Sequence, residues 1–430
     1  MGRAPIKSSW EDQTRRNLDK ALAELLLRGG TTDRPGIKSA VIRAELPEAG
    51  FVHSTAVGQA NADSDAPMTT EHQFHLASVA KTMTATLVLQ LWEEKVLGPL
   101  GLDTTLYDLE MFDSAVFKSI HNMDGKNYGK MITVRHLLTH TSGIKDAAVD
   151  DANGTSKDVG EPAPGSYGFR LRDGIETHMA CLANPNCDVS TLITSKNWEM
   201  WNPSRPFDKE AGVINWFIST GTAASSLSPP GEAFHYSDTG FVILGLLTEK
   251  LTSKSLHRQL RDRIFDPLGM DKSYLAYAKD PEPTPWTHEV SDFYLGDIPG
   301  VTGRINLSFD RGGGGVVSTV SDLNKFLRTL MRGDLFEETG TLKEMLDWQL
   351  YPGINSPRAG VGLGIFAEGT RSGELAMGHS GVYGAKMYYQ PNGEIFFSGT
   401  VNQLVGVPYY WWTELLAVIA SGKSIRETIN

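Results

Sequence analysis

Two groups of short strand-like segments, one near each end of this 430-residue chain, constrain its fold more than any other feature. In the first group, residues 37–46 and 50–59 are rich in β-branched side chains that roughly alternate with polar ones, and a turn at 47–50 joins them. The second group is separated by Ser-Gly, Gly-Val and Asn-Gly turn signals. Its members are residues 362–369, 373–381, 383–391 and 394–402. We therefore expect one antiparallel sheet built from both chain termini.

Helical periodicity covers both ends of the chain and its middle. Residues 10–28 repeat apolar side chains at helical spacing and stop before a Gly-Gly pair, and residues 404–422 close the chain as a helix. Further helical patterns occupy residues 78–96, 133–140, 239–252, 254–266 and 319–332. The expected fold class is α/β, more narrowly α+β: a sheet flanked by helices, with an inserted, mainly helical domain.

The order of these segments predicts two domains. Residues 1–75 together with 300–430 would form the α/β sheet domain, and residues 76–299 the mainly helical domain. A long region at about 145–231, rich in Gly, Pro, Ser and Asp, interrupts the helical domain. Loops of this length are usually functional walls or lids, so we expect substrate specificity to reside there.

The composition limits the partners. The formal net charge is -11, and no Lys/Arg-rich run is present, which argues against a nucleic-acid partner. The longest apolar stretches end well before the length that spans a bilayer, so we expect a soluble protein without a membrane span. The first 30 residues lack a signal-peptide pattern, which favours the cytoplasm. A disulfide between Cys181 and Cys187 would instead indicate secretion, and the compartment stays open.

A serine and a lysine stand one helical turn apart where an apolar helix begins. Ser78 and Lys81 are at positions i and i+3, so their side chains share one helix face within hydrogen-bond reach. The N-terminus of a helix favours negative charge, and a neighbouring ammonium or amine can activate a hydroxyl. The pattern therefore predicts a nucleophilic serine. A second match, Ser142 to Lys145, contains a glycine and leads into a polar loop, so we interpret it as a turn.

Two distant segments carry further polar candidates. Tyr236 lies two residues before Asp238, which could cap the apolar helix that follows it. Residues 379–381, His-Ser-Gly, lie on a predicted strand, and a tyrosine-glycine pair comes shortly after them. A strand beside a nucleophile can offer a backbone N–H to an oxyanion, and glycine there lets a substrate approach closely.

Taken in order, these motifs resemble the signatures of the serine hydrolases with the penicillin-recognising fold. The relevant branch contains class C β-lactamases, D-alanyl-D-alanine carboxypeptidases and related esterases and acyltransferases. Its signatures S-x-x-K, Y-x-N and K/H-T/S-G correspond to residues 78–81, 236–238 and 379–381. Residues 132–144, 264–273 and 312–327 also resemble segments of these hydrolases. The resemblance covers most of the chain and implies a β-lactamase/transpeptidase-like fold.

The resemblance also implies a role for each matching residue. Ser78 would be the nucleophile, Lys81 the group that lowers its proton affinity, and Tyr236 the general base and later the general acid. The backbone N–H groups of Ser78 and Val382 would form the oxyanion hole. The expected cycle acylates the serine, releases the first product and passes the acyl group to water or another acceptor. Such a cycle needs no metal and no cofactor.

Two departures from the family pattern bear on the substrate. Asp238 stands where the family has an asparagine whose amide helps to hold the acyl side chain. His379 stands where β-lactamases have a lysine, which removes a fixed positive charge that would attract a β-lactam's carboxylate. We therefore expect neutral or cationic small molecules to be better substrates than anionic antibiotics. The substrate-binding candidates are Asp238, His379, Ser380, Gly381 and Tyr383.

Other interpretations of single motifs compete with this account. His136 and His140 stand at i and i+4, a spacing that can bind zinc, but the glutamate of H-E-x-x-H is absent and we expect a structural role. The run Arg311 to Gly315 lacks the ending of a phosphate-binding loop, which favours close backbone packing beside the helix at 78–96. The aromatic residues at 409–412 and in the long insertion either pack in the core or line an acyl or alcohol pocket.

The function we expect is hydrolysis of a small-molecule ester or amide through an acyl-enzyme, most simply by a carboxylesterase. The sequence leaves open an acyltransferase between small molecules, a D-alanyl-D-alanine carboxypeptidase or D-aminopeptidase, and a weak β-lactamase. A catalytically dead binding protein of the same fold is the non-enzymatic alternative, against which the intact Ser78, Lys81 and Tyr236 argue. The physiological substrate and the oligomeric state cannot be inferred from the sequence.

Overall fold

The structure of the chain is a computed structural model. It describes residues 9–28, 36–151, 155, 163, 166, 212–219, 221–276, 289–302, 305, 307–354, 358–404 and 411–422. The expectations for Cys181 and Cys187, for residues 409–410 and for most of the insertion at 145–231 lie outside these residues.

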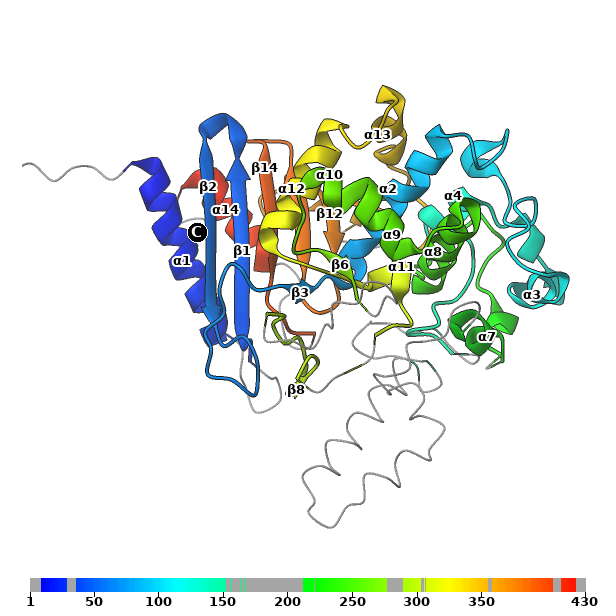
Figure 1. Ribbon diagram of the computed structural model, residues 1–430, viewed down its shortest axis with the longest axis horizontal. Coiled ribbons are helices and arrows are strands. Elements are labelled where there is room, and N and C mark those ends of the chain that lie inside the picture. Colours follow the sequence, from blue (N-terminus) through cyan, green and yellow to red (C-terminus); the bar gives the residue numbers. More distant parts are fainter. Residues whose placement is uncertain are drawn as a thin grey trace, which may run out of the picture.

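A seven-stranded antiparallel sheet joins the two ends of the chain (Figure 1). Its strand order is β10-β11-β12-β13-β14-β1-β2, so the last strand pairs with the first. The strands are β1 (Ser39–Leu46), β2 (Phe51–Gly58), β10 (Arg358–Val361), β11 (Phe366–Gly369), β12 (Leu375–Ser380), β13 (Lys386–Gln390) and β14 (Ile395–Thr400). The predicted sheet from both termini is confirmed. The edge strand β10 is an addition, because four residues are too few for an alternating pattern to stand out.

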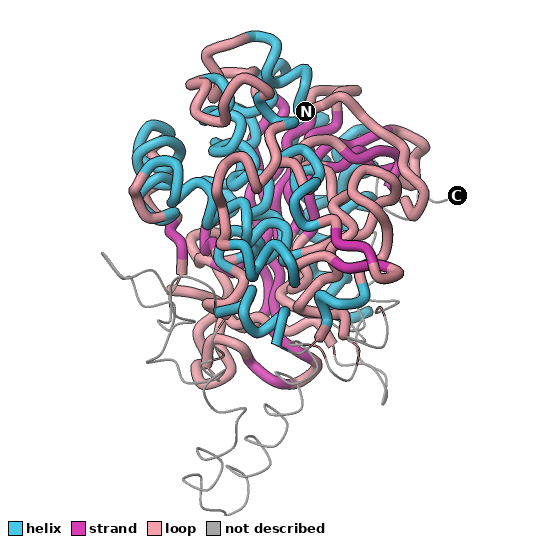
Figure 2. Tube along the Cα trace, turned by 90° about the vertical axis from the view of Figure 1, so that its right-hand side faces the viewer, coloured by secondary structure: helices cyan, strands magenta, loops and turns pink. Residues whose placement is uncertain are grey.

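Alternation along β1 sends its side chains into two separate cores. Ala40, Ile42 and Ala44 lie in a buried cluster with side chains from α1 (Trp10–Arg28) and α14 (Trp411–Ser421), whereas Val41 belongs to a larger cluster with the other helices. Helix α1 packs against β2 and α14. The sheet is therefore a middle layer with helices on both faces. Figure 2 shows the helices that form the larger cluster in front of the strands.

Helix α12 (Val320–Arg332) packs against β1, β13 and β14. Its contacts make it a covering helix of the sheet. The remaining α-helices within the described ranges are α2 (Ala80–Glu93), α3 (Ser114–Ser119), α4 (Val134–Leu138), α7 (Gly212–Ser219), α8 (Asp238–Thr252), α9 (Leu256–Leu260), α10 (Asp266–Leu268), α11 (Arg311–Gly314) and α13 (Thr339–Met345). A π-helical turn, Arg261–Phe265, joins α9 to α10, so the helix expected at 254–266 is irregular. None of the helices in the described ranges is long and apolar enough to cross a membrane.

Three further sheets are small. They comprise β3 (Phe74–His75), β9 (Val316–Ser318) and β6 (Tyr274–Leu275) in one sheet, β4 (Asn122–Met123) and β5 (Lys126–Asn127) in another, and β7 (Tyr294–Leu295) and β8 (Ile298–Pro299) in the third. The first of these sheets positions the candidate site, because β3 leads directly into the turn that carries Ser78.

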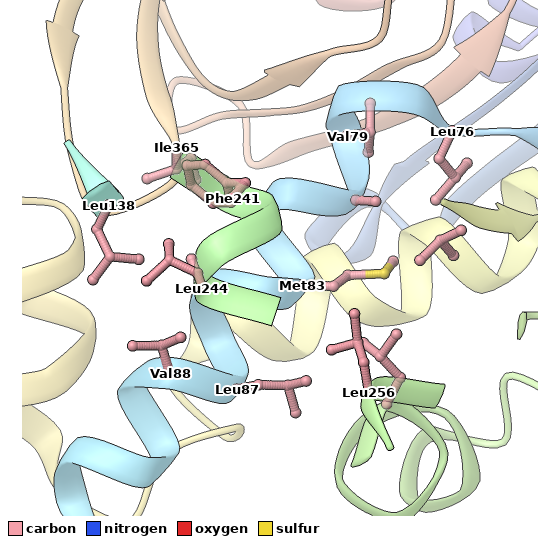
Figure 3. Close-up of a cluster of buried hydrophobic side chains, with 14 of the residues drawn as sticks. Leu76, Val79, Met83, Leu87, Val88, Leu138, Phe241, Leu244, Leu256 and Ile365 are labelled. Carbon is pink, nitrogen blue, oxygen red and sulfur yellow. The ribbon is translucent and has the colours of Figure 1, made fainter. Parts of the chain in front are cut away.

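Helix α2 runs through the larger core (Figure 3). Its side chains Met83, Leu87 and Val88 are buried in the same cluster as Leu244 of α8 and Leu256 of α9. Burying one large apolar side chain contributes about 1.5–3 kcal/mol, so this packing fixes the helix firmly. The start of α2 is also held from the sides, because the turn before it packs against β12 and α11.

Candidate active site

Ser78 lies in a short 3-10 turn, Ala77–Val79, that leads into α2. Ala77 has φ of 45°, in the left-handed region that costs a residue with a side chain about 1 kcal/mol or more. The backbone before the turn is anchored, because the Leu76 N–H donates to the Val316 carbonyl at 2.9 Å. The anchored and strained turn leaves the Ser78 side chain half-buried at the start of the core helix.

Lys81 is fully buried one turn further along α2. Its Nζ donates to Ser78 Oγ at 3.1 Å and to the Gly313 carbonyl at 2.6 Å, and it forms an ion pair with Asp238. Three acceptors therefore match the three N–H bonds of an ammonium group. Burial lowers the pKa of Lys81, but the neighbouring groups, first among them Asp238, raise this pKa more, so it ends above its usual value. The lysine that faces Ser78 is an ammonium ion.

The glycine run 311–315 packs closely on this lysine. A Cβ atom at Gly313 would lie 2.0 Å from Asp310 Oδ1, and one at Gly314 would lie 2.1 Å from Asp310 Oδ2. The two glycines thus leave space that the Asp310 carboxyl group fills. They also let the Gly313 carbonyl reach Lys81. This confirms the interpretation of the run as a place of close backbone packing beside α2.

The Tyr236 ring lies on the same ammonium group. Lys81 Nζ is 5.1 Å from the ring centroid of Tyr236, and the ring of His140 stacks on that of Tyr236 with 4.3 Å between centroids. The Tyr236 hydroxyl is buried and makes no well-formed hydrogen bond to a described residue. Burial and the charge of Asp238 raise the pKa of Tyr236 above its usual value, although Lys81 and the nearby Ser78 hydroxyl act in the lowering direction. Tyr236 is therefore a neutral phenol at rest.

Helix α8 begins differently from the prediction. Ser237, not Asp238, caps the helix, and its hydroxyl accepts a hydrogen bond from the Gly240 N–H at 3.4 Å. Asp238 is the first helical residue and its carboxylate faces Lys81 instead. The prediction that Asp238 is the cap was wrong, because its carboxylate forms an ion pair with the buried Lys81 ammonium. As a substrate-binding candidate Asp238 is therefore an ion-paired side chain that is only 19% exposed.

His379, at the end of β12, reaches the same region. Its ring centroid is 6.2 Å from that of Tyr236 and 5.0 Å from that of Phe366. Because the Ser380 carbonyl can only accept, Nδ1–H of His379 donates to it at 2.9 Å, and the buried Nε2 has no partner among the described residues. Burial, and then the charge of Lys81, hold the pKa of His379 well below its usual value. This imidazole is neutral and supplies no fixed positive charge.

Gly381 brings the β12 segment against the serine turn. A Cβ atom there would lie 2.2 Å from the Leu76 carbonyl oxygen, so only glycine allows this approach. The Gly381 N–H donates to the Ala385 carbonyl at 2.7 Å. Val382 follows in the turn, and its N–H donates to no carbonyl within the described part of the chain. The backbone next to Val382 thus lies beside the backbone that carries Ser78.

The two remaining substrate-binding candidates have partners of their own. Ser380 Oγ accepts from Lys386 Nζ at 2.8 Å and lies 2.6 Å from Tyr388 Oη. Tyr383 stacks on Phe293 with 4.1 Å between the ring centroids. Of the five candidates, His379 approaches the Tyr236 ring and Gly381 approaches the serine turn, whereas the hydroxyl of Ser380 is bound to groups on β13.

The two histidines at 136 and 140 serve separate parts of the fold. His136 Nδ1 accepts the Thr133 N–H at 3.2 Å, which completes the cap of α4. His140 Nδ1 accepts the Ser237 N–H at 3.1 Å, at the start of α8. These bonds support the structural role expected for both residues. His140 also supports the Tyr236 ring, because the two rings stack.

The second serine-lysine match is a turn, as predicted. Gly143 has φ of 75°, and Ser142 Oγ accepts the Ile144 N–H at 3.3 Å. Lys145 is buried and its Nζ donates to the Asp151 carbonyl at 2.9 Å. No helix within the described residues includes this segment, so the match has none of the geometry seen at Ser78.

Two residues of the site were not indicated by any motif. Asp310 stands behind Lys81, and its pKa is raised to about 7 by burial and then by Asp238, with Lys81 acting against the rise. Arg358 of β10 places its guanidinium 5.4 Å from the Tyr236 ring centroid. The position of Asp310 two residues before a run of four glycines was a weak signal, and Arg358 gave none.

Comparisons with known proteins agree with this architecture. A family model described as Beta-lactamase matches residues 26–185 and 199–416. Penicillin-binding protein 4 of Amycolatopsis lactamdurans is 28% identical over 225 residues, which are 52% of this chain and 42% of that protein. The D-stereospecific amidohydrolase from Streptomyces sp. has a similar structure, with TM-score 0.64 and 21% identity over 96% of this chain and 99% of that chain. EstCE1, a hydrolase with promiscuous acyltransferase activity, gives TM-score 0.61 and 19% identity over 95% and 100%.

The coverage of these matches differs between the two kinds of comparison. The matched regions cover 42%, 40% and 53% of three of the curated relatives, so the chain spans about half or less of their length. The two solved structures are covered almost fully, and at their low identity they show the fold alone.

Proposed function

The chain belongs to the beta-lactamase family of serine hydrolases with the penicillin-recognising fold, and from this premise we propose that it hydrolyses small-molecule esters or amides through an acyl-enzyme on Ser78. One observation carries the proposal: the Lys81 ammonium contacts Ser78 Oγ at 3.1 Å and lies 5.1 Å from the Tyr236 ring centroid. A hydroxyl in the turn before α2, an ammonium on α2 and a phenol just before α8 thus lie close together. This is the set of groups that activated-serine catalysis needs.

Lys81 acts as a charge in this mechanism. Its three N–H bonds point to Ser78, Gly313 and Asp238, so it has no lone pair with which to accept the serine proton. A hydrogen bond from an ammonium stabilises the alkoxide that forms as the serine attacks. The remaining candidate base is Tyr236, whose phenolate would form beside the Lys81 cation. Because its pKa is raised, the phenolate is a minor form at neutral pH.

The rest of the cycle uses the same groups, with Tyr236 acting first as an acid and then as a base. Protonated Tyr236 gives its proton to the leaving group, and the first product departs. Water then attacks the ester on Ser78 while Tyr236 takes a proton from that water. The bond to Ser78 Oγ breaks, Tyr236 returns the proton to this oxygen, and the acid product leaves. Backbone N–H groups of Ser78 and Val382 would hold the negative oxygen in both steps, which is supported by the close approach of Gly381 to Leu76.

The charge arrangement around Lys81 favours simple acyl groups. Asp238 is occupied by the lysine and offers no amide N–H to an acylamino side chain. We therefore propose a carboxylesterase that accepts short acyl groups ahead of a peptidase for D-alanyl peptides. The fold is shared with an amidohydrolase and with a hydrolase that also transfers acyl groups, so both activities belong in the test.

A substrate panel tests the proposal. Turnover of p-nitrophenyl acetate and p-nitrophenyl butyrate is compared with cleavage of a peptide ending in D-Ala-D-Ala, for the wild-type chain and for Ser78→Ala. We expect ester turnover that disappears in the variant. Faster cleavage of the peptide would contradict the esterase assignment, and transfer of the acyl group to added alcohol in preference to water would indicate an acyltransferase.

A further inference from the structure

Arg358, the first residue of the edge strand β10, holds its guanidinium against three aromatic rings. The distances from its Cζ to the ring centroids are 4.5 Å for Phe366, 5.4 Å for Tyr236 and 5.6 Å for Phe234. All three lie within the range of attraction between a cation and an aromatic face. The positive charge is thus held on the aromatic wall that includes the ring of the proposed general base.

None of the described residues brings a counter-charge into contact with the guanidinium. The side chain of Arg358 forms no ion pair or hydrogen bond with a described residue, and its Nε is buried without a partner among them. Its register partner on β11 is Glu368, which is buried and acts electrostatically on Lys386. A cation that is partly removed from water and left unpaired is costly, and a bound anion would remove that cost.

The neighbouring groups leave Arg358 as the fixed positive charge on this side of Tyr236. His140 and His379 are both buried, and the charge of Arg358 adds to burial in lowering their pKa values, so both imidazoles are neutral. The Lys81 ammonium is already paired with Asp238. An anionic group that approaches Tyr236 from the β10 side therefore meets Arg358, a cation that no described residue neutralises by direct contact.

We propose that Arg358 binds a carboxylate on the leaving-group side of the substrate. The proposal rests on the proposed function, in which Tyr236 protonates the leaving group, because the leaving group must then lie against the ring that Arg358 contacts. A guanidinium suits a carboxylate because two parallel N–H bonds match its two oxygens. His379 supplies no fixed positive charge, and in this proposal the charge comes from another strand instead.

A binding measurement tests the subsite without relying on turnover. Ser78→Ala protein is titrated calorimetrically with 3-hydroxybenzoate and with its methyl ester, which lacks the carboxylate. We expect the acid to bind more tightly than the ester. In the same background, Arg358→Gln should weaken binding of the acid by about tenfold or more, which is the scale of a charge-assisted hydrogen bond. Equal binding of the acid and the ester, or an unchanged affinity for the acid in Arg358→Gln, would overturn the proposal.

Kinetics on a matched pair of esters gives the second readout. For 3-acetoxybenzoate and its methyl ester, each corrected for its rate with hydroxide, Arg358→Gln should lower the ratio of the two kcat/KM values by about tenfold. Arg358→Lys should restore part of the ratio. The control is Arg258→Gln on α9, a side chain 62% exposed and paired with Asp262, which removes one positive charge from the surface. An equal loss of ratio in this control would overturn the proposal.

The two tests separate the possible failures. If wild-type protein hydrolyses neither ester, the proposed function fails, and the calorimetric comparison still decides the carboxylate subsite. If both esters are hydrolysed with a ratio that Arg358→Gln does not change, the subsite fails and the esterase assignment stands. Thermal melting of each variant confirms that the comparison is made on folded protein.

Discussion

The Lys81 ammonium and the Asp238 carboxylate form an ion pair at the point where α2 and α8 begin. The carboxylate raises the pKa of the lysine, whose burial acts in the opposite direction, and it also adds to the effect of burial in raising the pKa of Tyr236. An asparagine at this position would do neither. The acid at position 238 therefore makes Tyr236 a weaker acid, so that its phenolate requires a higher pH.

Asp238→Asn should shift the pH dependence of catalysis toward acid. If phenolate Tyr236 is the base, kcat/KM rises with pH as Tyr236 loses its proton. Removing the nearby negative charge lowers the pKa of Tyr236, so the rising limb should move to lower pH. The measurement is a kcat/KM profile on a p-nitrophenyl ester. An exposed carboxylate, Asp103→Asn, serves as the control, and a profile that stays in place in Asp238→Asn would speak against this role of the acid.

Asp310→Asn should stabilise the protein increasingly as the pH rises. The pKa of Asp310 is raised from 3.8 to about 7, first by burial, so the folded chain holds a proton there that the unfolded chain has lost. Between these two values the folded state binds more protons, and its stability falls as the pH increases. The amide of the variant does not titrate and shows no such loss. Melting temperatures of both proteins, taken at intervals from about pH 4 to pH 8, should diverge by a few degrees; a constant difference would contradict the prediction.

Tyr236→Phe should separate activity from stability. The Tyr236 hydroxyl has no well-formed hydrogen bond within the described structure, so its removal breaks none and the melting temperature should stay level or rise. The loss of the proposed acid and base should lower kcat by about 10²–10⁴-fold. Tyr388→Phe is the contrasting variant, because its hydroxyl lies 2.6 Å from Ser380 Oγ and its loss should cost about 1 kcal/mol of stability. A near-normal kcat in Tyr236→Phe would contradict the proposed role of Tyr236 as acid and base.

The parts of the site that could be predicted are those with a local signal. A spacing of three residues on a helix places Lys81 on the face of Ser78 whatever the rest of the chain does, and the observed distance is 3.1 Å. The sheet could be predicted because alternation along β1 and its C-terminal partners reflects burial on two faces. Gly381 could be predicted as a place of close approach, although only the fold identifies Leu76 as the neighbour.

The rest depends on contacts between distant segments. Ser237 and Asp238 are both good helix caps, and the choice between them follows from the position of Lys81 in another helix. The high pKa of Asp310 requires the glycine turn that encloses its carboxylate. Arg358 reaches Tyr236 only because a four-residue strand joins the edge of the sheet. No pattern within a single segment carries this information.

Covalent labelling of Ser78 tests the central claim most directly. The folded chain is incubated with a fluorophosphonate, and its intact mass and its proteolytic peptides are measured, with Ser78→Ala in parallel. The account predicts one adduct, located on the peptide that contains Ser78, and none in the variant. An unlabelled wild-type protein, or an adduct that persists in Ser78→Ala, would contradict it.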